Sequence, residues 1–157
     1  MNSDNYRYRI LDIRRGTTVD GPGFRTSIYM AGCNHQCPGC QNPDSWDFSG
    51  GEEMSLEELM SIIEEEDFDV TLTGGDPLMH PESTAKLAKA IKATGHCVWL
   101  YTGYTWEEIL STPRLQLPLP YLEAIVEGPY VEKLRDPDLI FRGSSNQRII
   151  YLKKELR

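Results

Sequence analysis

Apolar and polar residues follow two different periods along this chain, and each change of period marks an expected element. Residues 6–15 alternate between apolar and polar side chains, which predicts a half-buried strand near the edge of a sheet. Residues 45–51 are polar and predict a connection. Short runs rich in apolar and β-branched residues predict five further strands, at 24–30, 68–73, 97–101, 123–127 and 148–152.

Two helices are predicted by the residues at their first turns. Ser55 is followed three positions later by Glu58, and Thr105 by Glu108. This spacing is typical of a capping box, in which each side chain of the pair bonds the backbone N–H group of the other residue. The first of these helices presents an apolar stripe at helical spacing, formed by Leu56, Leu59, Met60 and Ile63.

A third helix is expected from about residue 82 to residue 94, because Pro81 suits a first helical turn and Gly95 suits the position after a helix end. Strands and helices then alternate along the chain, which predicts a parallel sheet with right-handed crossovers. A closed eight-fold barrel needs about 200 residues or more. The 157 residues therefore predict a single domain, residues 1–157, built as an incomplete parallel (β/α) barrel or curved open sheet.

Charge and hydropathy narrow the class of protein. The chain has 24 acidic and 16 basic residues, a net charge of −8, which argues against binding a nucleic-acid backbone. It has no apolar run of about 18 residues, so we expect no membrane-spanning helix. No secretory signal opens the sequence, and we therefore expect a cytoplasmic protein with reduced thiols.

Three cysteines lie within eight residues, directly after the strand expected at 24–30. Cys33, Cys37 and Cys40 have the spacing Cys-x3-Cys-x2-Cys, so their thiolates can converge on one soft metal centre. A closed iron–sulfur cluster or structural zinc site usually takes four protein ligands. A compact set of three therefore favours an iron–sulfur cluster with one metal position open to another ligand.

Zinc is the alternative interpretation of the same cysteines. A zinc site would need a further ligand, which His35, Cys97 or another histidine could supply. Zinc sites usually show a second pair of cysteines or histidines further along the chain, and this sequence has none. Disulfides are disfavoured by the expected compartment. The residues alone leave both metal sites open.

Two more strand ends are followed by unusual loops. Gly74-Gly75-Asp76-Pro77 follows the strand at 68–73, and Thr102-Gly103-Tyr104 follows the strand at 97–101. Parallel α/β proteins bind their ligands at the carboxyl ends of the strands, so we expect these loops to face the cysteines. Glycines without a Cβ let the backbone approach a ligand closely. Asp76 has two interpretations, a charge that complements the ligand or a cap of the turn before Pro77.

The combination of these loops resembles the radical S-adenosylmethionine superfamily, and within it the activases of glycyl-radical enzymes. The narrowest resemblance is to the activating proteins of anaerobic ribonucleoside-triphosphate reductase, and it extends from residue 6 to residue 152. It rests on the order of the motifs along the chain: Asp20-Gly21-Pro22-Gly23, the cysteine motif with Cys37-Pro38-Gly39-Cys40, Trp46, Gly74-Gly75-Asp76-Pro77-Leu78, residues 99–104 and Arg142-Gly143-Ser144-Ser145-Asn146-Gln147-Arg148.

The resemblance implies a cofactor and a reaction. Cys33, Cys37 and Cys40 would bind three irons of a [4Fe-4S] cluster, and S-adenosylmethionine would chelate the fourth. Reductive cleavage of S-adenosylmethionine would give methionine and a 5′-deoxyadenosyl radical, which takes hydrogen from a glycine of the large subunit of the reductase. An external low-potential donor would supply the electron. The chemistry would belong to the cofactors, so no catalytic acid or base is expected.

The residues expected to contact S-adenosylmethionine follow from the same resemblance. Two of them depart from the superfamily's general pattern, because Gly39 replaces an aromatic residue and Asp76 replaces a glutamate. Both departures resemble the narrower family. They leave adenine without a side-chain partner in the cysteine loop, where the backbone of residues 39–41 is the candidate contact, and Tyr104 is the best aromatic candidate elsewhere. Asn146 and Gln147 are candidates for the same face. The expected contacts are Gly39, Cys40, Gln41, Gly74, Gly75 and Asp76.

Two alternative functions remain at the level of sequence. The first is an activase of another glycyl-radical enzyme, of the pyruvate formate-lyase type. Such activases share the Asp-Gly-Pro-Gly motif, but they are usually longer, have an aromatic residue before the third cysteine and lack the Gly-Ser-Ser-Asn-Gln ending. The second is a zinc-binding module without enzymatic activity, which metal analysis would distinguish.

Overall fold

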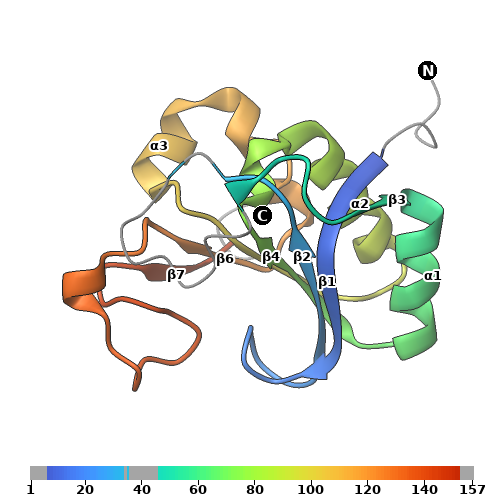
Figure 1. Cartoon of the computed structure of the whole chain (residues 1–157), viewed down its shortest axis with the longest axis horizontal. Coiled ribbons are helices and arrows are strands. Elements are labelled where there is room, and N and C mark those ends of the chain that lie inside the picture. Colours follow the sequence, from blue (N-terminus) through green and yellow to red (C-terminus); the bar gives the residue numbers. More distant parts are fainter. Residues whose placement is uncertain (1–6, 34, 36–45, 153–157) are drawn as a thin grey trace.

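The computed structural model of the chain describes residues 7–33, 35 and 46–152 (Figure 1). Seven strands form one sheet in the order β3-β1-β2-β4-β5-β6-β7. The strands are β1 (Arg7–Thr17), β2 (Arg25–Met30), β3 (Glu52–Ser55), β4 (Asp69–Gly74), β5 (Val98–Tyr101), β6 (Ala124–Glu127) and β7 (Arg148–Tyr151). The helices are α1 (Leu56–Glu66), α2 (Pro81–Ala93) and α3 (Trp106–Ser111), with short 3₁₀ helices η3 (Pro77–Met79), η4 (Pro113–Gln116), η5 (Leu119–Tyr121) and η6 (Glu132–Leu134).

The sheet is open, as expected, but it is not parallel throughout. Its central strands β2, β4, β5 and β6 pair in parallel. The pairs β1–β2, β1–β3 and β6–β7 are antiparallel, so the predicted parallel sheet is confirmed for the central strands only. The connections explain the difference. Helices join the parallel strands, whereas residues 18–24 join β1 to β2 and residues 128–147 join β6 to β7 without an α-helix.

The strand at the sheet's edge was missed. β3 follows the polar connection and pairs with the start of β1, so β1 is the second strand rather than the first. Two of its four residues are glutamates, and its burial pattern runs from exposed to half-buried. An exposed edge strand needs no apolar side chains, because it has solvent on its outer side. The pattern of hydrophobic residues therefore carried no signal for it.

Local signals located the helices correctly. The Ser55 and Thr105 side chains accept hydrogen bonds from the N–H groups of Glu58 and Glu108, and each glutamate returns a bond to its partner's backbone. Both capping boxes are thus confirmed. Pro81 occupies the first position of α2, and Gly95 has a positive φ of 90° just beyond its end.

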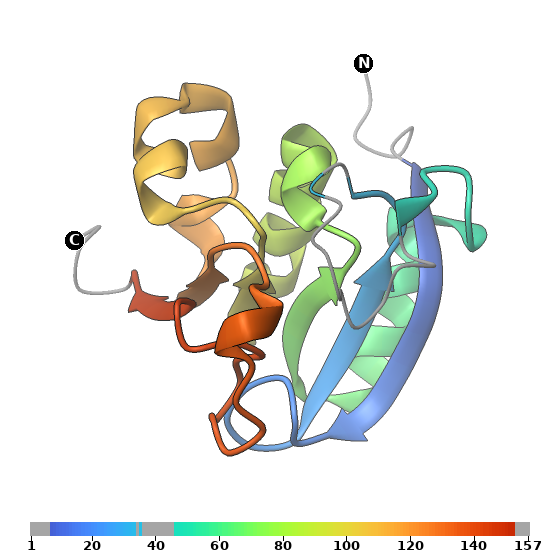
Figure 2. The same ribbon diagram turned by 60° about the vertical axis from the view of Figure 1, so that its left-hand side comes forward.

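The two faces of the sheet differ in chemistry. The face that α1 and α2 cover carries the main hydrophobic core, in which the strands place Ile28, Leu72, Leu100 and Ile125. Figure 2 shows α1 behind β1 and β2, on the side of the sheet away from the segment that follows β6. The neighbouring positions of the same strands point to the other face.

That second face is only partly apolar. It carries a small cluster around Trp99, with Ala124 and Val126. Beside it lies Arg25, a buried arginine whose side chain donates to Thr71 Oγ1, Val70 O and Pro22 O at 2.9, 2.9 and 3.1 Å. Burial lowers the pKa of its guanidinium. This face is covered by loops rather than by α-helices, and the cavity described below lies on it.

Candidate functional site

A large cavity opens where the parallel strands β4, β5 and β6 end. Its volume is about 810 Å³. Pockets of about 300–1,000 Å³ hold cofactors and small substrates, so this one has the size of a ligand site. One wall consists of strand-end residues, which include Gly74, Gly75, Thr102, Gly103 and Gly128. Residues between 130 and 147 form much of the rest, among them Tyr130, Arg135, Phe141, Arg142 and Gln147.

Cys33 lies on the wall of this cavity, together with Gly74 and Gly75. It is half-buried, and its backbone N–H donates to Trp46 O at 3.3 Å. The structure thus brings one predicted metal ligand to the same cavity as the two predicted glycines. The other predicted ligands, Cys37 and Cys40, and the predicted contacts Gly39 and Gln41 lie outside the described residues.

Gly74 is a glycine because β2 lies against it. Its φ is +112°, and a Cβ there would stand 2.2 Å from the backbone nitrogen of Met30. The next residue, Gly75, donates its N–H to Met30 O at 2.7 Å. A residue with a Cβ at position 74 would displace β2. These glycines therefore have a structural role, the close contact between β4 and β2, in addition to the expected approach of a ligand.

Asp76 is fully buried, and both of its carboxylate oxygens accept hydrogen bonds from the protein. Oδ1 accepts from the N–H of Leu78 at 2.9 Å and so caps η3. Oδ2 accepts from Thr102 Oγ1 and from the N–H of Gly103, both at 2.9 Å. Asp76 is not one of the residues that line the cavity. Of its two interpretations, the turn cap is the one that its contacts match.

His35 completes the surroundings of Asp76 Oδ2, which lies 2.6 Å from its Nε2. Since this oxygen already accepts from an amide, Nε2 carries the proton and donates. Burial lowers the pKa of His35, but the hydrogen bond and the charge of Asp76 outweigh it, so the net shift is upward. The ring meets Tyr104 edge-on, with the centroids 4.6 Å apart. His35 is thus packed into the site rather than exposed on its loop.

The zinc alternative can be examined at the same place. Donor atoms of Cys33, His35 and Asp76 lie within 4.8 Å of one another. The Nε2 of His35 donates to the carboxylate, so Nδ1 is the ring nitrogen left to bind a metal, as is usual for metal-bound histidines. Cys97 precedes β5, at the opposite end of that strand from the cavity, and is half-buried. Burial and then Glu123 raise the pKa of its thiol, which disfavours the thiolate that metal binding requires.

Two tyrosines on the cavity wall were not predicted as site residues. Tyr29 and Tyr101 lie on β2 and β5, at positions that point away from the helices. The signal was available, because polar residues alternate with core residues in these strands, but both tyrosines could be read as packing. Tyr104, the predicted partner of adenine, does not line the cavity and directs its hydroxyl to Met79 Sδ at 3.9 Å.

The predicted turn at Asp20–Gly23 also reaches the cavity. Asp20 lies on its wall and accepts a hydrogen bond of 2.6 Å from the Tyr29 hydroxyl. Its backbone carbonyl accepts from Thr71 Oγ1 at 2.7 Å. These bonds hold the loop against the second face of the sheet, so the motif contributes to the shape of the cavity.

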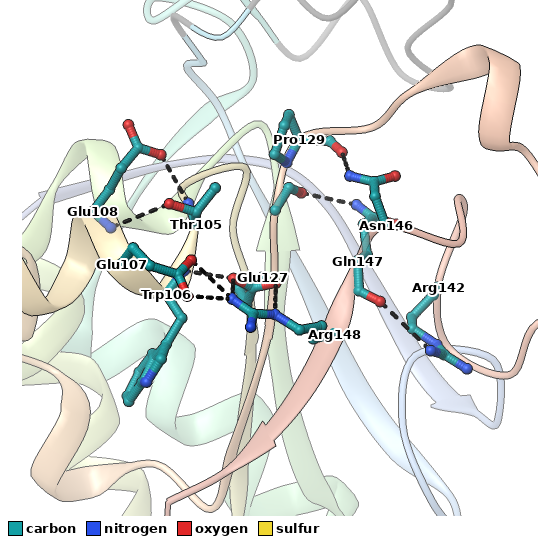
Figure 3. A network of polar contacts seen from close by, with 11 residues as sticks. Thr105, Trp106, Glu107, Glu108, Glu127, Pro129, Arg142, Asn146, Gln147 and Arg148 are labelled. Carbon is teal, nitrogen blue, oxygen red and sulfur yellow. Dashed lines mark hydrogen bonds and ion pairs between the residues drawn. The ribbon is translucent and has the colours of Figure 1, made fainter.

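The motif before β7 folds on itself (Figure 3). Gln147 Oε1 accepts from the N–H groups of Gly143 and Ser144 at 2.9 and 3.1 Å, and its Nε2 donates to Gly128 O at 3.0 Å. Asn146 Nδ2 donates to Pro129 O at 2.8 Å. Most of this motif therefore ties the segment after β6 to β7, while Gln147 and Arg142 also line the cavity.

Comparisons with known proteins agree with these features. Residues 19–150 match a family described as a 4Fe-4S single cluster domain. The chain is 38% identical to the anaerobic ribonucleoside-triphosphate reductase-activating protein of Pasteurella multocida, over 85% of this chain and 90% of that one. Proteins of the same name are 36% identical in Escherichia coli K12, over 86% and 93%, and 35% identical in Enterobacteria phage T4, over 83% and 86%. Within the described part of the chain, no helix is long and apolar enough to cross a membrane.

Proposed function

Since this chain belongs to the family of anaerobic ribonucleoside-triphosphate reductase-activating proteins, with a 4Fe-4S single cluster domain, we propose that it activates such a reductase by radical chemistry. The substrate is a glycine of the large reductase subunit, which the reaction converts to a glycyl radical. The observation that carries the proposal is the position of Cys33 on the wall of the large cavity, together with Gly74 and Gly75.

The cofactors of this proposal are a [4Fe-4S] cluster and S-adenosylmethionine. Cys33, Cys37 and Cys40 hold the cluster and leave one iron open. When bound, and with one electron from an external low-potential donor, these cofactors would supply reductive cleavage of an S–C bond to methionine and a 5′-deoxyadenosyl radical, and the hydrogen of the glycine would end in 5′-deoxyadenosine. The donor set fits, because thiolates are the usual ligands of such clusters and a set of three leaves room for a chelating ligand.

The chain's own residues would bind S-adenosylmethionine, orient it and enclose it in the cavity. The backbone of Gly74 and Gly75 faces the cavity and offers polar groups to the amino group of S-adenosylmethionine, and Gly39, Cys40 and Gln41 are proposed to contact the rest of it. Asp76 acts on the same loop from behind, since its carboxylate is occupied by protein donors. The protein thus supplies placement and protection for a reaction whose chemistry belongs to the cofactors.

The open sheet supports the identity of the substrate. A glycine inside another protein can be reached only if its backbone loop enters the site. The sheet ends at β3 on one side and β7 on the other, without closing. The cavity of about 810 Å³ lies at the carboxyl ends of the parallel strands, where such a loop would enter. In this proposal the protein acts in the cytoplasm.

The first experiment is an anaerobic assay of cofactor cleavage. The protein is reconstituted with iron and sulfide, reduced with dithionite and given S-adenosylmethionine, and 5′-deoxyadenosine is measured. We expect about four irons per chain and product formation. Cys37→Ala should lose the product, whereas Cys97→Ala, which changes the cysteine outside the motif, should retain it.

The same assay contains the outcomes that contradict the proposal. Zinc retained without iron or sulfide, after anaerobic purification, would exclude the cluster. An intact cluster that gives no product in either condition, alone and with the reductase present, would exclude cleavage of S-adenosylmethionine. Product without a glycyl signal in the added reductase would leave the radical chemistry but exclude this substrate.

A further inference from the structure

Two buried carboxylates hold the segment that follows β5. Asp76 and Glu127 are 0% and 1% exposed. Asp76 Oδ2 accepts from the Thr102 hydroxyl and the Gly103 N–H at 2.9 Å, whereas Glu127 Oε2 accepts from the N–H of Trp106. A buried carboxylate is costly unless hydrogen bonds compensate it, so each of these residues requires its partners to stay in place. Figure 3 shows the Glu127 side of this arrangement.

Of these two carboxylate residues, Asp76 alone bonds with described residues of the cysteine motif, and it does so on both sides of Cys33. Its backbone N–H donates to Gly32 O at 2.8 Å. Its Oδ2 accepts from His35 Nε2 at 2.6 Å. The two bonds therefore bracket Cys33, one residue before it and two residues after it. Glu127 bonds instead with Arg148 of β7.

The imidazole of His35 is also fixed by shape. A Cβ on Gly103 would stand 2.6 Å from the ring carbon Cδ2 of His35, so the ring lies directly on that glycine's backbone. The edge-on contact with Tyr104 holds another side of the ring. Gly103 is thus needed both as a donor to Asp76 and as a flat surface for His35.

We propose that His35 and Asp76 are positioning residues that fix Cys33 against the ends of β4 and β5. The proposal rests on the proposed function, because its purpose is to hold one ligand of the cluster at a constant place on the cavity wall. The Asp76 carboxylate accepts hydrogen bonds from the protein and does not line the cavity, so its role in this proposal is to position Cys33. Groups behind the ligands of a metal centre usually set the orientation of those ligands, solvent access and redox potential.

The test compares three variants of the reconstituted protein. His35→Phe keeps a ring and removes the donor, while His35→Gln keeps an amide donor near the place of Nε2. Glu127→Gln is the matched control, since it alters the other buried carboxylate that holds this segment, and the described part of the cysteine motif forms no bond with it. Retention of iron against a chelator, the redox potential and the electron paramagnetic resonance spectrum of the reduced cluster are measured, together with thermal stability.

We expect His35→Phe to retain iron about ten- to 100-fold more weakly than the wild type and to change the spectrum of the reduced cluster. His35→Gln should recover most of the difference. Glu127→Gln should lower thermal stability but leave iron retention and the spectrum unchanged. Asp76→Asn should resemble His35→Phe, and if that variant does not fold, the two His35 variants still decide the question.

Three results would overturn the proposal. One is a His35→Phe protein with the iron retention, potential and spectrum of the wild type. Another is a Glu127→Gln protein whose cluster changes as much as that of His35→Phe, because the effect would then reflect general loosening of the segment. The third is a wild-type protein without iron and sulfide, which would also overturn the proposed function and is recognised before any variant is compared.

Discussion

Two tyrosine hydroxyls in the cavity wall have opposite hydrogen-bonding situations. The Tyr29 hydroxyl donates to Asp20 Oδ2 at 2.6 Å. The Tyr101 hydroxyl is buried and has no partner among the residues that the structure describes. Burial raises the pKa of both phenols, and the hydrogen bond and charge of Asp20 add to the shift at Tyr29. Two residues of one type in one cavity thus differ in what their hydroxyls contribute to stability.

The difference predicts opposite effects of removing each hydroxyl. Tyr29→Phe should lower the free energy of unfolding at neutral pH by about 1 kcal/mol, the usual net worth of a hydrogen bond. Tyr101→Phe should leave it unchanged or raise it, because it removes a buried group that has no described partner. Urea denaturation of the protein without cofactors measures both values. Equal losses in the two variants would contradict this explanation.

The sign of the pH dependence follows from the same pKa shifts. A phenol whose pKa is raised in the folded state keeps its proton there while the unfolded chain loses it. Its stabilising contribution is complete below the unfolded value of about 10 and is lost as the pH rises above that value. In the same denaturation series, the loss of stability at alkaline pH should be smaller in Tyr29→Phe than in the wild type.

At the scale of elements, Glu127 joins the end of β6 to the start of α3 and to β7. It accepts from the N–H of Trp106, the first residue of α3. Arg148, at the start of β7, donates to both of its oxygens, at 3.2 and 3.0 Å, and also to Glu107 (Figure 3). Glu127, and then Glu107, raise the pKa of the guanidinium, so it is charged at any ordinary pH. One buried carboxylate therefore secures three elements.

The two partners of Arg148 should differ in energetic weight. Arg148→Met leaves Glu127 buried without its cation and should lower the urea midpoint clearly. Glu107→Gln removes only an exposed pair and should leave the midpoint close to that of the wild type, because exposed ion pairs contribute little. A larger effect of Glu107→Gln than of Arg148→Met would show that the exposed pair, and not the buried one, holds β7.

At the scale of the whole molecule, the main core and the cavity lie on opposite faces of the sheet. The core consists of apolar side chains from the strands and from the helices that cover them, and neither of the two cysteines that the structure describes, Cys33 and Cys97, belongs to it. Cys33 lies on the cavity wall instead. Folding of the sheet should therefore depend little on whether a cluster is bound.

A variant with all three cysteines of the motif replaced tests this independence. Cys33→Ala, Cys37→Ala and Cys40→Ala combined should bind no iron after reconstitution. Its free energy of unfolding should differ from that of the metal-free wild type by no more than about 1 kcal/mol, because the strands and their covering helices carry the main core. Circular dichroism during denaturation measures this. Loss of a cooperative transition would mean that the motif is part of the folding core.

Short-range patterns were sufficient for most elements, and they limited the chemistry of the cysteine motif to an iron–sulfur cluster or a zinc site. The capping boxes at Ser55 and Thr105 involve residues three positions apart, so the sequence contains the whole interaction. The spacing of Cys33, Cys37 and Cys40 likewise carries its own chemical meaning, and the match to a 4Fe-4S family agrees with it. The glycines after β4 were also predicted to meet at the carboxyl edge of the sheet, where the cavity lies.

Only the tertiary structure decided what lies between elements distant in sequence. β3 pairs antiparallel with β1, and β7 pairs antiparallel with β6, and both pairings depend on where the connecting segments lead the chain. The exposed edge strand β3 also leaves little trace in the hydrophobic pattern. The contact between His35 and Asp76 spans 41 residues, and that between Arg148 and Glu107 also spans 41. A sequence states which groups can form such bonds. Which of them meet is determined by the packing of the strands that carry them, because burial makes each polar group depend on the partner that the fold brings to it.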